Sequence, residues 1–195
     1  MSEDMEKSRR FESREEVSAA LNSERDISGA DLSGLDLEGI KLAGANIADV
    51  NFKGANLAKS RIAAANLENA DFSGANLEDS RIAAVNLGDS KFVGAQMSGV
   101  KLATSNLENA DMTGADLRDS RWFAVNVSGA DFSKADMTGA RGGAVEWNSA
   151  KVPPEERPAT VSPPPWVPIA FAGLVVAFIA LIVILKRRQD EQPGW

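Results

Sequence analysis

The stretch "SRIAAANLENADFSGANLEDSRIAAVNLGDS" (Ser60–Ser90) repeats its first five letters after twenty residues. Each five-residue block in it has a large apolar residue at one position and a smaller residue two positions earlier. The register extends in both directions, because every fifth residue from Ile27 to Met137 is Ile, Leu, Val, Phe, Met or Trp. Gly142 interrupts the series, and Trp147 resumes it. Neither the period of a helix nor that of a strand keeps one residue in five in a core. The pattern therefore predicts a chain that turns a corner every five residues around a narrow interior.

Blocks such as "ADLSG" (Ala30–Gly34), "ANLED" (Ala75–Asp79) and "ADMTG" (Ala110–Gly114) resemble the A(D/N)LXX pattern of the pentapeptide repeat family. The resemblance covers residues 25–150 and implies an all-β solenoid, a right-handed, four-sided parallel β-helix of about six coils with four blocks in each coil. Large core residues twenty positions apart would then stack. They include Phe52, Phe72, Phe92 and Phe132, with Met112 between the last two.

The charged segment 1–24 is predicted to contain a short capping helix at about residues 14–22. Ser13 lies three residues before Glu16, which is a capping-box pattern, and apolar residues follow at helical spacing. Such a helix would cover the apolar rungs and open backbone groups of the first coil. A frayed charged tail is the alternative.

Beyond the repeats, residues 151–165 form a proline-rich linker, which favours an extended polyproline spacer. Residues 166–185 contain no charge and are long enough to cross a bilayer as one helix, with Trp166 at one boundary and Lys186 at the other. Residues 186–195 form a basic and polar tail. Small residues along one side of the expected membrane helix favour close helix packing and an oligomer; they are Ala170, Gly173, Ala177 and Ala180.

The sequence predicts a single-pass membrane protein, and two orientations are open. Residues 1–16 lack the apolar run of a secretory signal peptide, which favours repeats on the cytoplasmic side. The bases that follow residue 185 favour the opposite arrangement, with a cytoplasmic tail and extracytoplasmic or periplasmic repeats. We expect the cytoplasmic repeat domain.

The composition argues against an enzyme. The chain has no Cys, His or Tyr, which removes thiolate nucleophiles, imidazole bases and Cys/His zinc sites. Its carboxylates recur at positions set by the repeat, as in a solvated surface, and its glycines form no phosphate-binding motif. The net charge of −7 with bases interspersed is not typical of nucleic-acid binding. We therefore expect no catalytic residues, no cofactor and no metal.

One predicted face differs from the other three. Where the other blocks have mostly Asp or Asn, it has bases followed mostly by small residues, and it ends in an aromatic residue. The expected partner-binding residues are Lys41, Arg61, Arg81, Lys101, Arg121 and Phe123, and Arg141 continues the series. An acidic partner could dock on such a strip. The alternative is a solvated face, with Asp79 paired to Arg81 and Asp119 paired to Arg121 around the corners.

These observations favour a non-enzymatic, membrane-anchored scaffold or accessory subunit that docks a protein partner, itself membrane-associated, through one face of a rigid rod. The resemblance implies an alternative, because some members of the family imitate DNA and protect DNA gyrase from inhibitors. The expected membrane helix and the basic face both depart from that pattern.

Overall fold

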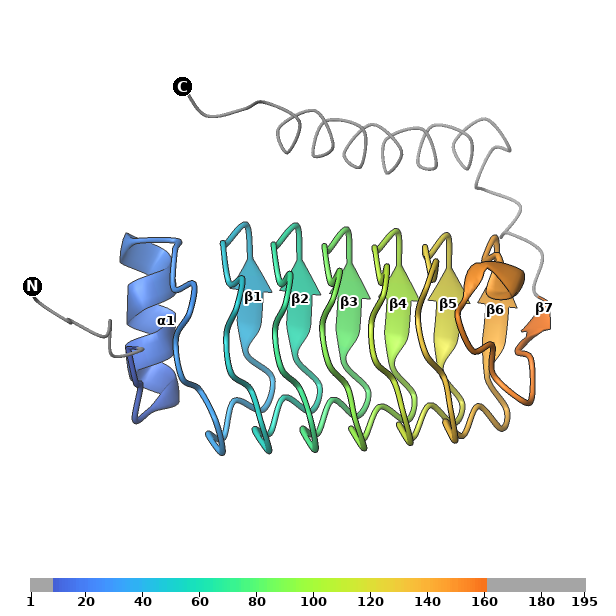
Figure 1. The fold of residues 1–195 in the computed structure, drawn as a ribbon. Helices are drawn as coiled ribbons and strands as arrows, with labels where there is room; N and C mark the ends of the chain where they lie inside the picture. Colours follow the sequence, from blue (N-terminus) through green and yellow to red (C-terminus); the bar gives the residue numbers. More distant parts are fainter. Residues whose placement is uncertain (1–8, 161–195) are drawn as a thin grey trace, which may run out of the picture.

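Residues 9–160 are described by the computed structural model, in which one strand from each coil lies beside its neighbours along a rod (Figure 1). A helix lies across the N-terminal end. The elements are α1 (Arg14–Ser23), β1 (Lys41–Ala43), β2 (Arg61–Ala63), β3 (Arg81–Ala83), β4 (Lys101–Ala103), β5 (Arg121–Phe123), β6 (Arg141–Gly143), the 3-10 helix η1 (Trp147–Ser149) and β7 (Ala159–Thr160). The protein is thus a parallel β-solenoid of about six coils, as predicted.

The repeat sets the register of the solenoid. Strands β1 to β7 form one parallel sheet in sequence order, and from β1 to β6 each residue pairs with the residue twenty positions later. Isolated parallel bridges with the same spacing form three further columns, which contain Asn46, Asn51 and Asn56. Four columns of backbone pairing therefore run along the rod, and only one of them is a continuous sheet.

The interior is filled by the predicted ladders of apolar side chains. Phe52 stacks on Phe72 with ring centroids 4.8 Å apart, and Phe72 stacks on Phe92 at 4.9 Å. The residue at the centre of each block is almost fully buried, and the small residue two positions earlier is usually buried as well. One such ladder fills each side of the rod, so the core is narrow and continuous, as the five-residue period predicts.

Each corner uses a residue in the left-handed region. Gly34 has a φ of 69°, and the glycine-rich column that contains it adopts this conformation without a steric penalty. The same conformation occurs at Ala84, with a φ of 56°, and at Asn69, with a φ of 59°. Corner geometry thus accounts for the recurring glycines, as expected from the sequence.

The predicted N-terminal helix is confirmed, with bounds one residue longer than expected. Ser13 is its N-cap, and the Ser13 side chain accepts a hydrogen bond from the Glu16 backbone N–H. The Glu16 side chain reaches back to the Glu12 N–H rather than to that of Ser13. Val17 and Ala20 are buried against the first coil, so α1 covers that end of the core.

The first part of the expected linker differs from the prediction. Residues 151–160 are not a free spacer, because they complete the last coil. The Phe132 N–H donates to the Val152 carbonyl at 2.9 Å, and Ala159 pairs with Arg141 in the sheet. The physical reason is that the last coil has open backbone groups, which need partners. These partners come from the chain immediately after the repeats.

An aromatic cluster closes the same end. Trp147 lies 5.5 Å from Trp122 and 5.8 Å from Phe132, measured between ring centroids. It occupies the space beside Gly142, where an added Cβ would lie 3.2 Å from the Trp147 ring. Gly142 therefore interrupts the apolar series because the Trp147 side chain fills the space that its own side chain would take.

The expected membrane segment, residues 166–185, lies outside the described residues, as do Ala170, Gly173, Ala177 and Ala180. Within residues 9–160, no helix is both long enough and apolar enough to cross a membrane.

Candidate interaction face

The bases predicted from the sequence form one column on the sheet. Lys41 pairs in register with Arg61, and the series continues by single coils to the end of the sheet. We call this column the basic ladder; it consists of Lys41, Arg61, Arg81, Lys101, Arg121 and Arg141. Successive rungs are about 4.8 Å apart, the spacing of adjacent strands. The structure thus brings together all five predicted bases, and Arg141 continues the column, as the sequence indicated.

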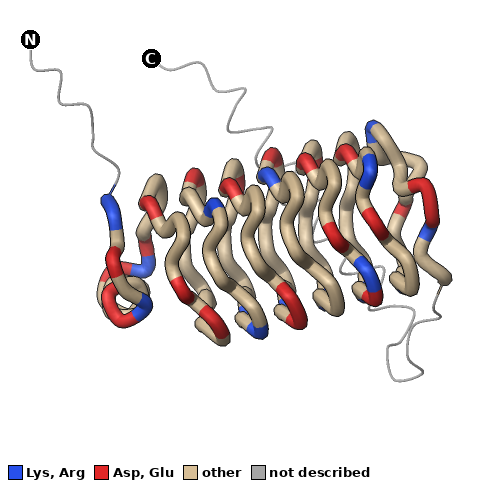
Figure 2. The backbone as a smooth tube through the Cα atoms, turned by 90° about the horizontal axis from the view of Figure 1, so that it is seen from below, with Lys and Arg blue, Asp and Glu red and all other residues tan. Residues whose placement is uncertain are grey.

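All six side chains of the basic ladder are exposed, and within residues 9–160 none of them forms an ion pair. Several bases elsewhere on the solenoid form ion pairs, although Lys91 and Lys134 do not within residues 9–160. Lys59 lies 2.6 Å from a Glu38 oxygen, and Lys53 lies 3.1 Å from an Asp71 oxygen. Charged residues of both signs recur from coil to coil (Figure 2). The basic ladder is therefore a column of like charges that the described protein leaves without carboxylate partners.

The alternative interpretation, in which nearby acids pair with the ladder, is not supported within residues 9–160. Asp79 does not pair with Arg81, because its carboxylate lies over the next coil: a Cβ added at Gly99 would be 2.6 Å from the Asp79 Oδ1. Asp119 lies in the same way over Gly139. Both acids occupy left-handed corners that direct their side chains along the rod. Local neutralisation therefore does not explain the basic ladder.

Beside the ladder runs a strip of small residues. It is made of Ala43, Ala63, Ala83 and Ala103, which pair in register, and Phe123 continues it on β5. Phe123 is half-buried and pairs with Ala103 on one side and Gly143 on the other. The predicted Phe123 thus lies on the same face as the bases. Together they form a flat surface, with cations along one side and mostly small side chains beside them.

The corner just before the basic ladder buries two hydroxyl groups that have no hydrogen-bond partner within residues 9–160. Ser60 and Ser80 are fully buried, and their Oγ atoms have no hydrogen-bond partner. Ser120 lies in the same column, and its Oγ accepts from the buried Trp122 Nε1 at 2.8 Å. An unpartnered buried hydroxyl costs about 1–3 kcal/mol. This side of the rod is therefore not optimised for stability.

The adjacent face is built differently. The residues at the position equivalent to the basic ladder form a chain of side-chain amides. Each Nδ2 donates to the Oδ1 of the residue twenty positions earlier, at distances between 2.7 and 3.2 Å. We call this the asparagine ladder; it consists of Asn46, Asn66, Asn86, Asn106 and Asn126. The sequence analysis did not predict this hydrogen bonding, which the identical amide at every twentieth position could have indicated.

Some bases outside the basic ladder are hydrogen-bonded to acidic side chains of the same surface. Arg118 Nη2 lies 2.6 Å from Asp116 Oδ2, and this hydrogen bond lowers the pKa of the Asp116 carboxyl from its ordinary value. The hydrogen bond from Lys59 to Glu38 raises the pKa of Lys59. These bases already have partners. They therefore offer less to an external anion than the basic ladder does.

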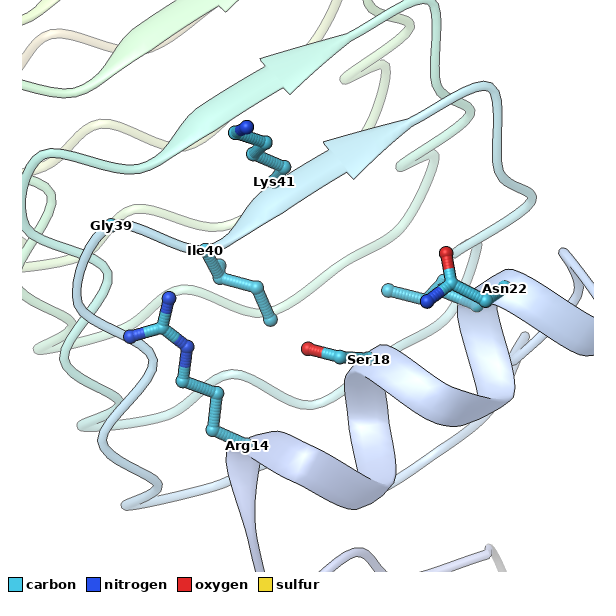
Figure 3. Close-up of a pocket in the computed structure, with 7 residues that line it drawn as sticks. Arg14, Ser18, Asn22, Gly39, Ile40 and Lys41 are labelled. Carbon is cyan, nitrogen blue, oxygen red and sulfur yellow. The ribbon is translucent and has the colours of Figure 1, made fainter.

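Two pockets lie at the ends of the rod, and sequence reasoning identified neither. A pocket of about 270 Å³ separates α1 from the edge of β1 (Figure 3). Another, of about 360 Å³, lies beside Asp136, Glu155 and Glu156. Among residues 9–160, no cluster of three or more possible metal-ligating side chains occurs.

Comparison with solved structures finds proteins built of the same kind of repeat. A pentapeptide repeat protein from the Arabidopsis thaliana thylakoid lumen is 29% identical over 47% of this chain and 63% of its own, with a TM-score of 0.46. This chain therefore spans less than two thirds of that protein. Rfr23 from the cyanobacterium Cyanothece 51142 is 23% identical over 67% of this chain and 96% of its own, with a TM-score of 0.44. A trypsin-treated variant of QnrB1, a plasmid-mediated fluoroquinolone resistance protein, is 22% identical over 65% of this chain and 70% of its own, with a TM-score of 0.37.

No curated protein sequence matches this chain significantly. The family profile described as pentapeptide repeats matches residues 26–62 and 80–119 in eight copies. These ranges include β1, β3 and β4, with the bases Lys41, Arg81 and Lys101. The chain therefore contains repeats of the pentapeptide family in these two ranges.

Proposed function

We propose that this protein is a non-enzymatic scaffold or accessory subunit that docks an acidic protein partner through the basic ladder and the adjacent alanine strip. One observation carries the proposal. The ladder is an exposed column of six cations that makes no ion pair within residues 9–160, whereas several other bases of the rod do. Like charges on adjacent strands repel one another. An acidic partner would remove that repulsion.

The shape of the surface supports a protein partner of extended contact area. The ladder covers every coil from β1 to β6, and the strip beside it carries only Ala, Phe123 or Gly. Small side chains allow a partner to approach the backbone closely, while the flanking cations steer an acidic surface and fix its register. Phe123 supplies an aromatic contact near one end, the residue type that is enriched where binding energy concentrates.

The proposed function includes attachment to a membrane through residues 166–185, with the solenoid on the cytoplasmic side. The twenty uncharged residues support the attachment itself, with the bases that follow them as anchors at the membrane interface. Ala170, Gly173, Ala177 and Ala180 would allow helix packing with a second membrane helix. The partner is then expected in or beside a membrane complex.

A charge-reversal experiment tests the docking face. The triple variant Arg61→Glu, Arg81→Glu, Arg121→Glu is compared with a control that reverses Lys53, Lys91 and Lys134 elsewhere on the rod. Both change the net charge equally. After mild detergent extraction, we expect the ladder variant to lose at least 90% of the proteins that co-purify with the wild type, as quantified by mass spectrometry, and the control to keep most of them. Equal recovery with both variants would refute the proposal.

A further inference from the structure

Strand β1 has an open edge. It is the first strand of the sheet and pairs only with β2. In the following coils, the N–H of the first strand residue points toward the N-terminal end: Arg61 donates to the Ile40 carbonyl and Arg81 to the Ser60 carbonyl, both at 2.9 Å. The residue equivalent to these acceptors for Lys41 is Ala20, whose carbonyl instead accepts from the Glu24 N–H at 2.8 Å. The Lys41 N–H therefore lacks the partner that every later coil provides.

Alternate residues of a strand direct their backbone groups to the same side. Ala43 therefore points its N–H and C=O toward the N-terminal end together with those of Lys41, while Leu42 bonds toward β2. Three residues of strand thus offer two donors and two acceptors in a row. This is the arrangement that an added strand uses when it joins an exposed sheet edge.

The other columns are covered at this end. Residues 9–11 pair with the first coil, since the Asp31 N–H donates to the Arg9 carbonyl at 2.8 Å. The Asn46 N–H donates to the Arg25 carbonyl at 2.9 Å. On the remaining column, Arg14 Nη1 donates to the Glu38 carbonyl at 2.6 Å. Within the described chain, the β1 edge has no such cover from a strand or side chain.

A pocket lies where the missing strand would be. It separates β1 from α1, with Arg14, Ser18 and Asn22 on the helix side and Ile40 and Lys41 on the sheet side (Figure 3). Ser18 and Asn22 make no side-chain hydrogen bond within residues 9–160, so they are free to bond to the outer edge of an added segment. The lining includes two cations and no acid. The pocket therefore favours an acidic occupant.

We propose that the β1 edge is a strand-addition site, at which an extended acidic segment of a partner protein pairs with Lys41–Ala43 beneath α1. The added strand extends the sheet by one rung. An Asp or Glu that it presents outward lies opposite Lys41, and opposite charges on paired strands attract. The site goes beyond the proposed docking face, because it uses backbone groups at the end of the rod rather than the outward side chains along it.

The probe is a fluorescein-labelled heptapeptide of alternating valine and aspartate, and its binding to the full chain in mild detergent is followed by fluorescence anisotropy. We expect saturable binding at submillimolar peptide. The same peptide with its three central backbone nitrogens methylated keeps its charge but cannot pair, and we expect at least tenfold weaker binding. Equal binding of the two peptides would reduce the interaction to charge attraction and overturn the proposal, as would the absence of binding.

Matched variants place the site. Asn22→Trp fills the pocket and should weaken peptide binding at least tenfold; Ser18→Trp does the same from another turn if Asn22→Trp lowers the melting temperature. Ala19→Trp, on an exposed position of the same helix outside the pocket, should leave binding within twofold. Unchanged binding after both pocket-filling substitutions contradicts the proposal.

Two further outcomes separate this site from the alternatives. The double variant Arg81→Glu, Arg121→Glu lies two or more rungs from the edge, beyond a Debye length of about 8 Å. It should therefore bind the peptide within threefold of the wild type even if it loses the partners of the docking face. A wild-type dimer that Asn22→Trp converts to a monomer would assign the edge to a second copy of this chain and refute the partner segment.

Discussion

The basic ladder and the asparagine ladder occupy equivalent positions on adjacent faces, but their side chains interact in opposite ways. Each amide of the asparagine ladder donates to the one before it, so the face satisfies its own side chains. The bases of the ladder repel one another, and buried serines without partners lie behind two of them. One face stabilises the rod, whereas the other gives up stability and keeps its charges available. Such a contrast on one repeated backbone supports the proposed role of the basic face in docking a partner.

The largest expected effect comes from breaking the amide chain at its centre. Asn86→Asp removes the donor to the Asn66 Oδ1, at 3.0 Å, and places a carboxylate beside Glu68. We expect the free energy of unfolding to fall by about 3 kcal/mol, because an acceptor then faces an acceptor at a half-buried site. Urea unfolding followed by circular dichroism measures the change. A loss below 0.5 kcal/mol would mean that the amides contribute little.

The serine column behind the basic ladder gives the next effect. Ser120→Ala leaves the buried Trp122 Nε1 without its acceptor and should lower the free energy of unfolding by about 2 kcal/mol. Ser80→Ala is the control, because the Ser80 Oγ has no partner to lose. We expect Ser80→Ala to be neutral or stabilising in the same urea experiment. Equal destabilisation by both substitutions would contradict the hydrogen-bonding difference between them.

The corners of the two faces differ in residue type. Left-handed residues on the basic face include Ala84, with a φ of 56°, whereas the asparagine face has Asn69 at 59°. Alanine is strained there by about 1–2 kcal/mol, and glycine loses about 0.5–1 kcal/mol through chain entropy. Ala84→Gly should therefore raise the free energy of unfolding by about 0.5–1 kcal/mol. Asn69→Gly should not raise it, since asparagine tolerates this conformation. A thermal melt of both variants compares the two corners.

The smallest effect tests repulsion in the basic ladder. Arg81 lies between Arg61 and Lys101, so Arg81→Gln should stabilise the protein by about 0.3 kcal/mol at low ionic strength. The gain should disappear at 0.5 M salt, where exposed charges are screened. Lys91→Gln, on another face, is the control and should show no salt-dependent gain. A salt-independent change at residue 81 would attribute the effect to packing.

The sequence predicts most of the fold because one constraint repeats. The five-residue period places Phe52 over Phe72, and the twenty-residue period places Arg61 beside Arg81, as the structure confirms. The capping box likewise predicts α1. The ends are harder to predict, because they depend on which backbone groups remain open. Val152 and Ala159 pair with the last coil although their local composition favours a spacer.

The candidate site can also be predicted only in part from the sequence. The period assigns the bases to one face, but it does not show where carboxylates point. Asp79 is two residues from Arg81, yet its left-handed backbone sends its carboxylate over Gly99. The type of residue just before the central apolar residue does not set the turn either. Lys91 lies one coil after Asp71 in the same column and keeps the backbone bridge. The pocket at β1 depends on how a helix meets an edge, and no periodicity encodes that contact.

Because equivalent coils stack on one another, the length of the rod is set by the number of coils. Each coil pairs only with its neighbours, so removing twenty residues, for example 60–79, should shorten the rod by about 4.8 Å and leave every face in place. Removing five residues instead would turn everything beyond the deletion by one face and carry Arg121 out of line with Lys41. Insertions and deletions in such a chain are therefore tolerated in whole coils, and a change in length can retune the distance between two docking points without redesigning either of them.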